Sequence, residues 1–292
     1  MKKNLLLALV LLSNFSICLS KSQEDFTDQD FAKYNIDDFD GVSDGKADFI
    51  TAALNIKSNF GLDKQGYISQ TTVIECPNMN KQDIYVQAKI WMESFCNNDK
   101  RAELRLDGNQ GSTLIARKRV IDVAGKEFRE RYGLKRRDMS GSKINLLVNI
   151  RVDVKDGKCR LTTTIEDYGI QYPTNNGGVI GGAVATGGIG SLIGAAVGSA
   201  VANALNVEQT MKPVNHFPFK ENEPFRAQKE GESDEKYLKK KEKHEAFQIK
   251  VLEYDKSPAV AYVASFLITQ IVHDKMLEAI TSAPSFENND NW

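Results

Sequence analysis

Histidine and cysteine, the residues that most often build active sites and metal centres, are scarce in this sequence. Its 292 residues include three histidines and four cysteines. The histidines are far apart along the chain, and no two cysteines stand at a chelating interval. We therefore expect no metal ion, no cofactor and no catalytic set of nucleophile, base and orienting residue. The three histidines are His216, His244 and His273.

Phosphate-binding motifs are also missing. The glycine-rich runs "GGVIGG" and "GGIGSLIG" are not followed by the Lys-Ser or Lys-Thr pair of a phosphate loop, nor do they follow a strand as a dinucleotide motif does. The sequence thus predicts a protein that is not an enzyme, and it identifies no small-molecule ligand.

Neither sign of charge is in excess, because 38 Lys and Arg face 39 Asp and Glu, for a net charge of -1. No global field attracts nucleic acid, so we expect no nucleic-acid partner. Charge is uneven along the chain, however. Residues 24–48 are rich in Asp, residues 117–137 are basic, and residues 168–207 carry no charge at all.

The first twenty residues have the order of a secretory signal peptide. Lys2 and Lys3 precede an apolar run over residues 5–12, and small or neutral residues follow up to a cleavage site before Lys21. The run is too short for a membrane anchor. Cys18 allows a lipoprotein alternative, but Ile17 is bulky where a small residue should precede the cysteine. We expect an exported protein, either periplasmic, associated with the outer membrane, or secreted.

Three cysteines remain after cleavage at this site: Cys76, Cys96 and Cys159. In an oxidising compartment one pair could form a disulfide, or all three could be small buried residues. Their spacing does not choose between these alternatives or select a pair.

Residues 21–62 are polar and acidic, with few apolar anchors, and we interpret them as a flexible leader with at most one short helix. The stretch from Asp40 to Thr51 resembles a calcium loop only faintly. Val42 occupies a ligand position, and Thr51 stands where a bidentate Glu is needed. A solvated acidic linker is the preferred interpretation.

Residues 63–170 combine strand signals with one helix. A strand ends at Pro77, and Asn80 then caps a helix whose apolar stripe should cover the sheet. Further strands are expected at 102–106, 112–123 and 143–155, followed by a tight turn at Asp156 and Gly157 and a returning strand. This order predicts an α+β domain with an antiparallel sheet covered by helices. The helical stripe consists of Ile84, Ala88, Trp91, Met92 and Phe95, and the sheet positions beneath it are Ile144, Val148 and Val152.

The C-terminal part, residues 208–282, is predicted to be helical. A charged helix opens at Ser233. Ser257 is then predicted to cap a second helix, which starts at Pro258 and runs to about Ser282. Its apolar stretch is too short to span a bilayer, so we expect it to pack on the sheet. Residues 283–292 are predicted to be disordered.

The run "LDKQGYISQTTVIECPNMNKQDIYVQAKIWM" and the strand pair "INLLVNIRVDVKDGKCRLTTTIEDY" resemble an exported Bacteroidetes family of unknown function, numbered 4468. The similarity covers about residues 62–170 and includes Pro77, the helix that bears Ala88, Lys89 and Trp91, and the "VKDGKCR" hairpin. It implies a fold similar to half of the TATA-binding protein: strand, helix, four strands, helix. It implies neither DNA binding nor any activity, since a fold is not a function. Two inserts depart from the family: one is basic and the other is rich in glycine.

The basic insert is a candidate contact for an anionic surface, because a cation near such a surface gains roughly 1 kcal/mol. Acidic residues lie between the basic ones, so a solvated loop is the alternative. The candidate residues are Arg117, Lys118, Arg119, Arg129, Arg131, Lys135, Arg136 and Arg137.

The glycine-rich insert, residues 174–207, repeats a small residue at every fourth position. On a helix this spacing forms one face on which another helix can approach closely, which is a glycine zipper. The zipper residues are Gly178, Gly182, Thr186, Gly190, Gly194, Gly198 and Ala202. A flexible linker or a helix pair buried within the protein is the alternative.

Together these features predict an exported protein whose zipper associates with a membrane or with copies of itself. A membrane-inserting effector or pore former is the second hypothesis, and a soluble periplasmic enzyme is the third. The sequence does not decide whether the zipper spans a membrane or packs within the protein.

Overall fold

A computed structural model describes residues 26–97, 99, 101–106, 112–172, 209–219 and 225–282. The predicted signal peptide, the glycine zipper and the predicted disordered tail lie outside the described residues.

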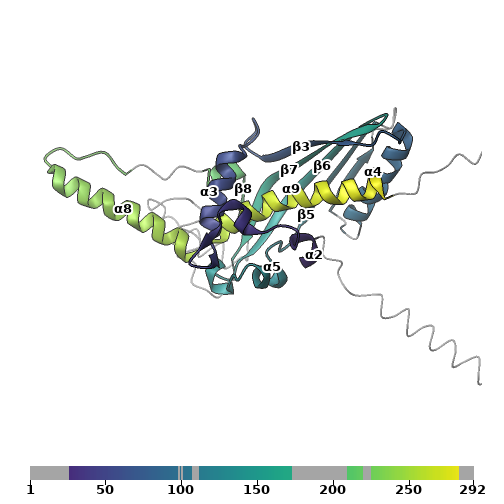
Figure 1. Cartoon of the computed structure of the whole chain (residues 1–292). Coiled ribbons are helices and arrows are strands. Elements are labelled where there is room, and N and C mark those ends of the chain that lie inside the picture. The colour runs from purple at the N-terminus through teal and green to yellow at the C-terminus, as the bar shows by residue number, and fades with distance from the viewer. Residues whose placement is uncertain are drawn as a thin grey trace, which may run out of the picture.

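A six-stranded antiparallel sheet forms the centre of the protein (Figure 1). The strand order is β3-β7-β6-β5-β4, and β8 pairs with the end of β7. The strands are β3 (Ile68–Glu75), β4 (Glu103–Leu106), β5 (Thr113–Val120), β6 (Lys143–Lys155), β7 (Lys158–Gln171) and β8 (Gln209–Met211). Gly157 adopts the left-handed conformation in the turn that joins β6 to β7, as the Asp-Gly pair predicts. The β6 strand matches its predicted range at both ends.

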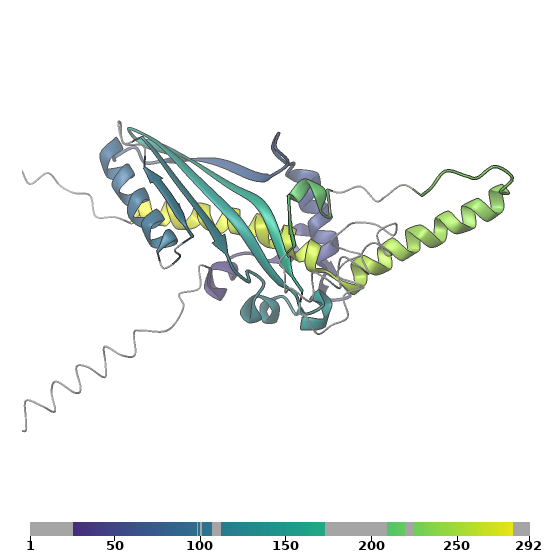
Figure 2. The same ribbon diagram turned by 180° about the vertical axis from the view of Figure 1, so that it is seen from behind.

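Two helices cover one face of this sheet, α4 (Lys81–Cys96) and α9 (Ser257–Thr281). Seen from behind, the strands stand in front of α9, with their other face towards the viewer (Figure 2). Asn80 caps α4 by accepting from the backbone N–H of Asp83, as predicted. Period-two alternation explains the two faces: even-numbered residues of β6 are buried under the helices, and most odd-numbered residues face solvent. The antiparallel α+β class is therefore confirmed.

Helix α9 is buried nearly all round, which requires cover on the side away from the sheet. That cover comes from the N-terminal segment, which holds α2 (Asp28–Phe31), the 3-10 turn η1 (Ile36–Phe39), the short hairpin of β1 (Val42–Ser43) and β2 (Lys46–Ala47), and α3 (Phe49–Asn59). The prediction of a flexible leader over residues 21–62 is wrong for residues 26–62.

The physical reason is that a few well-placed apolar side chains are enough when they fill one core. Phe31, Ile36, Phe49 and Ile56 are all at most 3 % exposed. Polar contacts add to this packing, because Tyr34 Oη donates to Asp274 at 2.7 Å. Asp48 caps α3 by accepting from two backbone N–H groups, so one of the acidic residues orders the segment.

Two further predictions need correction. The sequence predicts Trp91 to be part of the apolar stripe of α4 that covers the sheet. Trp91 is only half-buried, however, and stacks on Phe95, whereas Met92 is fully buried. Adjacent helical positions differ by about 100°, so the centre of the stripe falls on one of them only. The second concerns α9, whose N-cap is Lys256, so Ser257 is its first residue.

The remaining elements lie at one end of the sheet. They are α5 (Lys126–Arg131), the turn η2 (Arg136–Met139), the turn η3 (Pro213–Asn215) and α8 (Asp234–Tyr254). In Figure 1, α8 extends away from the sheet, and its first residues are the farthest from it. Among the described helices, none combines the length and the apolarity needed to cross a membrane.

Candidate functional site

The predicted functional segment, residues 174–207, connects β7 to β8, two strands that pair with each other. Antiparallel pairing aligns Tyr168 with Met211, Gly169 with Thr210 and Ile170 with Gln209. The end of β7 and the start of β8 therefore lie side by side. The zipper residues themselves, from Gly178 to Ala202, belong to the connection between these strands and lie outside the described residues.

A buried polar cluster fixes this end of the sheet to the start of α9. Tyr172 Oη donates to Asp255 at 2.9 Å, and Asp255 also accepts from the backbone N–H of Ser257 at 3.0 Å and from its hydroxyl at 2.6 Å. Ser257 Oγ lies 2.6 Å from Ser142 Oγ and 3.0 Å from the carbonyl of Met139. The chain thus leaves β7 from an anchored position.

The electrostatics of this cluster follow from burial. Asp255 is fully buried, and burial raises the pKa of its carboxyl, while the hydrogen bonds from Ser257 and Tyr172 lower it in part. Burial also raises the pKa of the Tyr172 hydroxyl well above its usual value, with the Asp255 carboxylate as the next cause. Tyr172 therefore remains a neutral donor. The cluster ties the end of β7, the segment from η2 to the start of β6, and the start of α9 together.

Three of the predicted cations gather at the same end. Lys135, Arg136 and Arg137 are exposed in and beside η2, just before β6 begins. The turn is tied to the start of α9, because the N–H of its N-cap residue Lys256 donates to the Asp138 carbonyl at 2.8 Å. Since Lys143 of β6 pairs with Gln171 of β7, these cations lie at the end of the sheet from which the connection leaves. We call Lys135, Arg136 and Arg137 the η2 cations.

The other predicted cations do not join this group. Arg117 and Arg119 lie on the open face of β5 and form ion pairs with Glu166 at 2.7 Å and Asp167 at 3.1 Å. The prediction that Lys118 contacts an anionic surface is wrong. The alternation of β5 places Lys118 on the covered face at 6 % exposure, where its ammonium donates to the Phe95 carbonyl at 2.7 Å.

The last two predicted cations lie in α5. Arg129 is half-buried and donates to the Ala124 carbonyl at 2.8 Å, and Arg131 is exposed. An arginine that satisfies a local carbonyl stabilises the turn before α5, so Arg129 has a structural role in addition to its charge.

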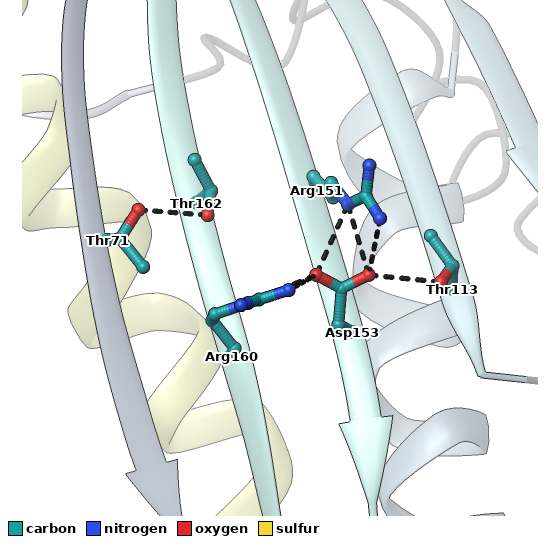
Figure 3. A network of polar contacts seen from close by, with 6 residues as sticks. All are labelled: Thr71, Thr113, Arg151, Asp153, Arg160 and Thr162. Carbon is teal, nitrogen blue, oxygen red and sulfur yellow. Dashed lines mark hydrogen bonds and ion pairs between the residues drawn. The ribbon is translucent and has the colours of Figure 1, made fainter. Parts of the chain in front are cut away.

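The open face of the sheet carries a network that the sequence analysis did not single out (Figure 3). Asp153 accepts from Arg151 at 2.9 Å, from Arg160 at 2.8 Å and from Thr113 at 3.0 Å. Burial alone would raise the pKa of Asp153, but these hydrogen bonds outweigh it and hold the pKa at about 2. The odd positions of β6, where Arg151 and Asp153 stand, are the signal that could have located it.

This network satisfies its own polar groups. Thr71 Oγ1 and Thr162 Oγ1 also pair across strands at 3.0 Å (Figure 3). The side chains of Arg151 and Arg160 are 52 % and 58 % exposed, and exposed ion pairs contribute roughly 0–1 kcal/mol each. We therefore regard this face as a hydrogen-bonded sheet surface and the β7–β8 end as the candidate functional site.

Metal binding finds no support in the described part of the chain, which contains no group of three or more His, Cys, Asp or Glu side chains suited to a metal ion. The three described cysteines form no disulfide with one another: Cys76 and Cys159 are buried, and Cys96 is half-buried. Burial raises the pKa of Cys159 to about 12, with Cys76 as the next cause.

An antiparallel sheet that is covered by helices on one face, and that follows the order strand, helix, four strands, defines the class of this domain as TBP-like α+β. Residues 71–168 match the family model described as a domain of unknown function (DUF4468) with TBP-like fold. Residues 71–168 are therefore similar to this family, and the resemblance to a TBP-like family of unknown function seen in the sequence is confirmed. The function of this family is unknown, so the match assigns no enzyme activity.

Two solved structures are similar. A TBP-like protein from Parabacteroides distasonis ATCC 8503 is 13% identical with a TM-score of 0.42, over 76% of this chain and 97% of that chain. A DUF4468 family protein from Bacteroides ovatus ATCC 8483 is 15% identical with a TM-score of 0.28, over 40% of this chain and 64% of that chain. A comparison with curated proteins gives no match.

Proposed function

We propose that this is an exported, non-enzymatic protein that associates with a membrane, or with copies of itself, through residues 174–207. The observation that supports the proposal is the pairing of β7 with β8, which holds the two ends of this segment next to each other. The segment is uncharged and carries a small residue at every fourth position, a pattern that suits close helix packing.

The paired ends limit how the segment can meet a bilayer. A single crossing would leave its ends on opposite sides of a hydrocarbon core about 30 Å thick, whereas neighbouring strands lie about 5 Å apart. The segment must therefore leave and return on one side. Two helical arms of about 15 residues would each extend roughly 22 Å, which is less than the core thickness.

We therefore favour a hairpin that enters one leaflet or packs on a second copy, with its small-residue face as the contact surface. The η2 cations strengthen the membrane alternative. Each cation close to an anionic surface gains roughly 1 kcal/mol, and all three lie at the end of the sheet where the segment begins. The DUF4468 domain would then be held at the membrane surface.

Membrane fractionation with carbonate extraction tests the proposal. The mature chain is compared with a variant that lacks residues 177–207, in which a short turn joins the adjacent ends. We expect the complete chain to stay with the membrane pellet, or to crosslink to itself, and the deletion variant to do neither. Equal behaviour of the two proteins, both with the melting curve of a folded domain, would refute the proposal. Release of a trapped dye from vesicles would instead favour a pore former.

A further inference from the structure

Helix α8 carries a groove that the proposed function does not use. Residues 225–232 run back along the first half of the helix, and we call them the strap. Two kinds of contact hold the strap in place. The ring of Phe225 lies 5.5 Å from that of Tyr237 and 5.3 Å from that of His244. Glu232 accepts from Arg226 at 2.8 Å and from Lys240 at 2.7 Å.

Between strap and helix lies an open groove with a volume of about 540 Å³. Its lining contains four cations, Arg226, Lys229, Lys240 and Lys243, beside aromatic rings that include Phe247. A wall that combines cations with apolar rings suits a ligand that carries a negative charge on an apolar body.

The cations of the groove are only partly neutralised. Glu232 compensates Arg226 and Lys240, and its hydrogen bonds, first with Arg226 and then with Lys240, hold the pKa of Glu232 at about 2. Lys229 and Lys243 have no carboxylate partner among the described residues. Two lysines without a carboxylate partner therefore remain for a ligand.

The placement of α8 favours a flat, extended occupant. The helix points away from the sheet in both views, and its charged surface is exposed along most of its length (Figures 1 and 2). Phe247, which lines the groove together with Lys243, is 41 % exposed. An exposed ring beside lysines fits the interface of a lipid bilayer, where apolar side chains enter below the headgroups.

We propose that the α8 groove binds the phosphate headgroups of an anionic lipid surface, with Lys229 and Lys243 as the main contacts. This deepens the proposed function, on whose membrane alternative it rests. The zipper segment is uncharged and should act on neutral and anionic bilayers alike, whereas the groove should distinguish between them. The η2 cations would also favour anionic lipid, so the part of the preference that is lost with Lys229 and Lys243 is the property that belongs to the groove.

The test is flotation of the complete mature chain with phosphatidylglycerol vesicles and with phosphatidylcholine vesicles. We expect the unaltered chain to prefer phosphatidylglycerol, and high salt to abolish the preference. Lys229→Gln combined with Lys243→Gln should lower affinity for phosphatidylglycerol about 30-fold, since two cations are lost at about tenfold per 1.4 kcal/mol. Binding to phosphatidylcholine should not change.

The matched control is Lys236→Gln combined with Lys239→Gln, which removes the same charge from positions of α8 that do not line the groove. If both pairs weaken binding equally, general charge rather than the groove is responsible, and the proposal is overturned. It is also overturned if the unaltered chain shows no preference, or if polyglutamate or inorganic phosphate binds the groove while vesicles do not.

A third variant, Gly194→Leu combined with Gly198→Leu, separates the two proposals. If this variant loses binding to both lipids, the result supports the proposal for the zipper. If the Lys229 and Lys243 variant loses the lipid preference, the result supports the proposal for the groove. A preference that survives in the zipper variant, and that falls when Lys229 and Lys243 are replaced as well, supports the groove as an independent site.

Discussion

Replacing Phe49 by Ala tests whether the N-terminal segment belongs to the core. Phe49 is fully buried, with its ring centroid 5.8 Å from that of Tyr132 and 6.0 Å from that of Phe128. Burying a phenylalanine contributes about 1.5–3 kcal/mol, and a cavity that does not collapse adds about 24 cal/mol per Å³. We therefore expect Phe49→Ala to lower the free energy of unfolding by about 3–5 kcal/mol.

The measurement is urea unfolding of the mature chain, followed by circular dichroism, with Leu54→Ala as the control. Leu54 lies in the same helix α3 but is 47 % exposed, so its replacement should change the free energy of unfolding by only about 0.5 kcal/mol. The dependence of the unfolding free energy on urea concentration, the m-value, should be the same for both variants. If Phe49→Ala costs no more than Leu54→Ala, the segment does not share the core.

Three further predictions concern the sheet and its ends. Met92→Ala should cost about 2–5 kcal/mol and Trp91→Ala distinctly less, because only Met92 is fully buried; thermal melts of the two variants decide this. Asp153 has its pKa held at about 2, so its ion pairs stabilise the fold above about pH 4, and this contribution is lost as the pH falls towards 2. The loss of unfolding free energy caused by Asp153→Asn, measured by urea unfolding, should therefore become smaller as the pH falls over that range. A loss that stays constant contradicts the prediction. Burial raises the pKa of Asp255, so ionising this group costs stability as the pH rises above the ordinary aspartate value of about 3.9. In a pH series of melting temperatures, Asp255→Asn should not show this loss of stability with rising pH. The same pH dependence in the variant and the unaltered chain contradicts the prediction.

Strong periodicity made part of this fold predictable. The alternation in β6, the Asp-Gly turn at Gly157 and the cap at Asn80 are local signals, and the structure follows them. The N-terminal segment was not predictable in the same way. Phe31 and Phe49 stand in an acidic stretch, and both rings pack against Phe128, which is far away in sequence.

The candidate site was predictable in pattern but not in position. The interval of four from Gly178 to Ala202 is visible in the sequence, but the three residues of β8 are too few for a strand signal. Their pairing with β7 is a tertiary contact that fixes both ends of the segment. Likewise, nothing local marks Lys118 as buried until the register of β5 is known.

Carbonate extraction and crosslinking of two matched variants test the central claim most directly. Gly194→Leu with Gly198→Leu adds bulk to the small-residue face of the zipper, whereas Ile193→Leu with Val197→Leu preserves bulk elsewhere. Both pairs raise or preserve hydrophobicity, so simple partitioning into lipid predicts that neither weakens retention. We expect the glycine pair to abolish membrane retention or self-association and the second pair to leave both unchanged. If the two pairs behave alike, the interval of four plays no part in association, and the account is contradicted.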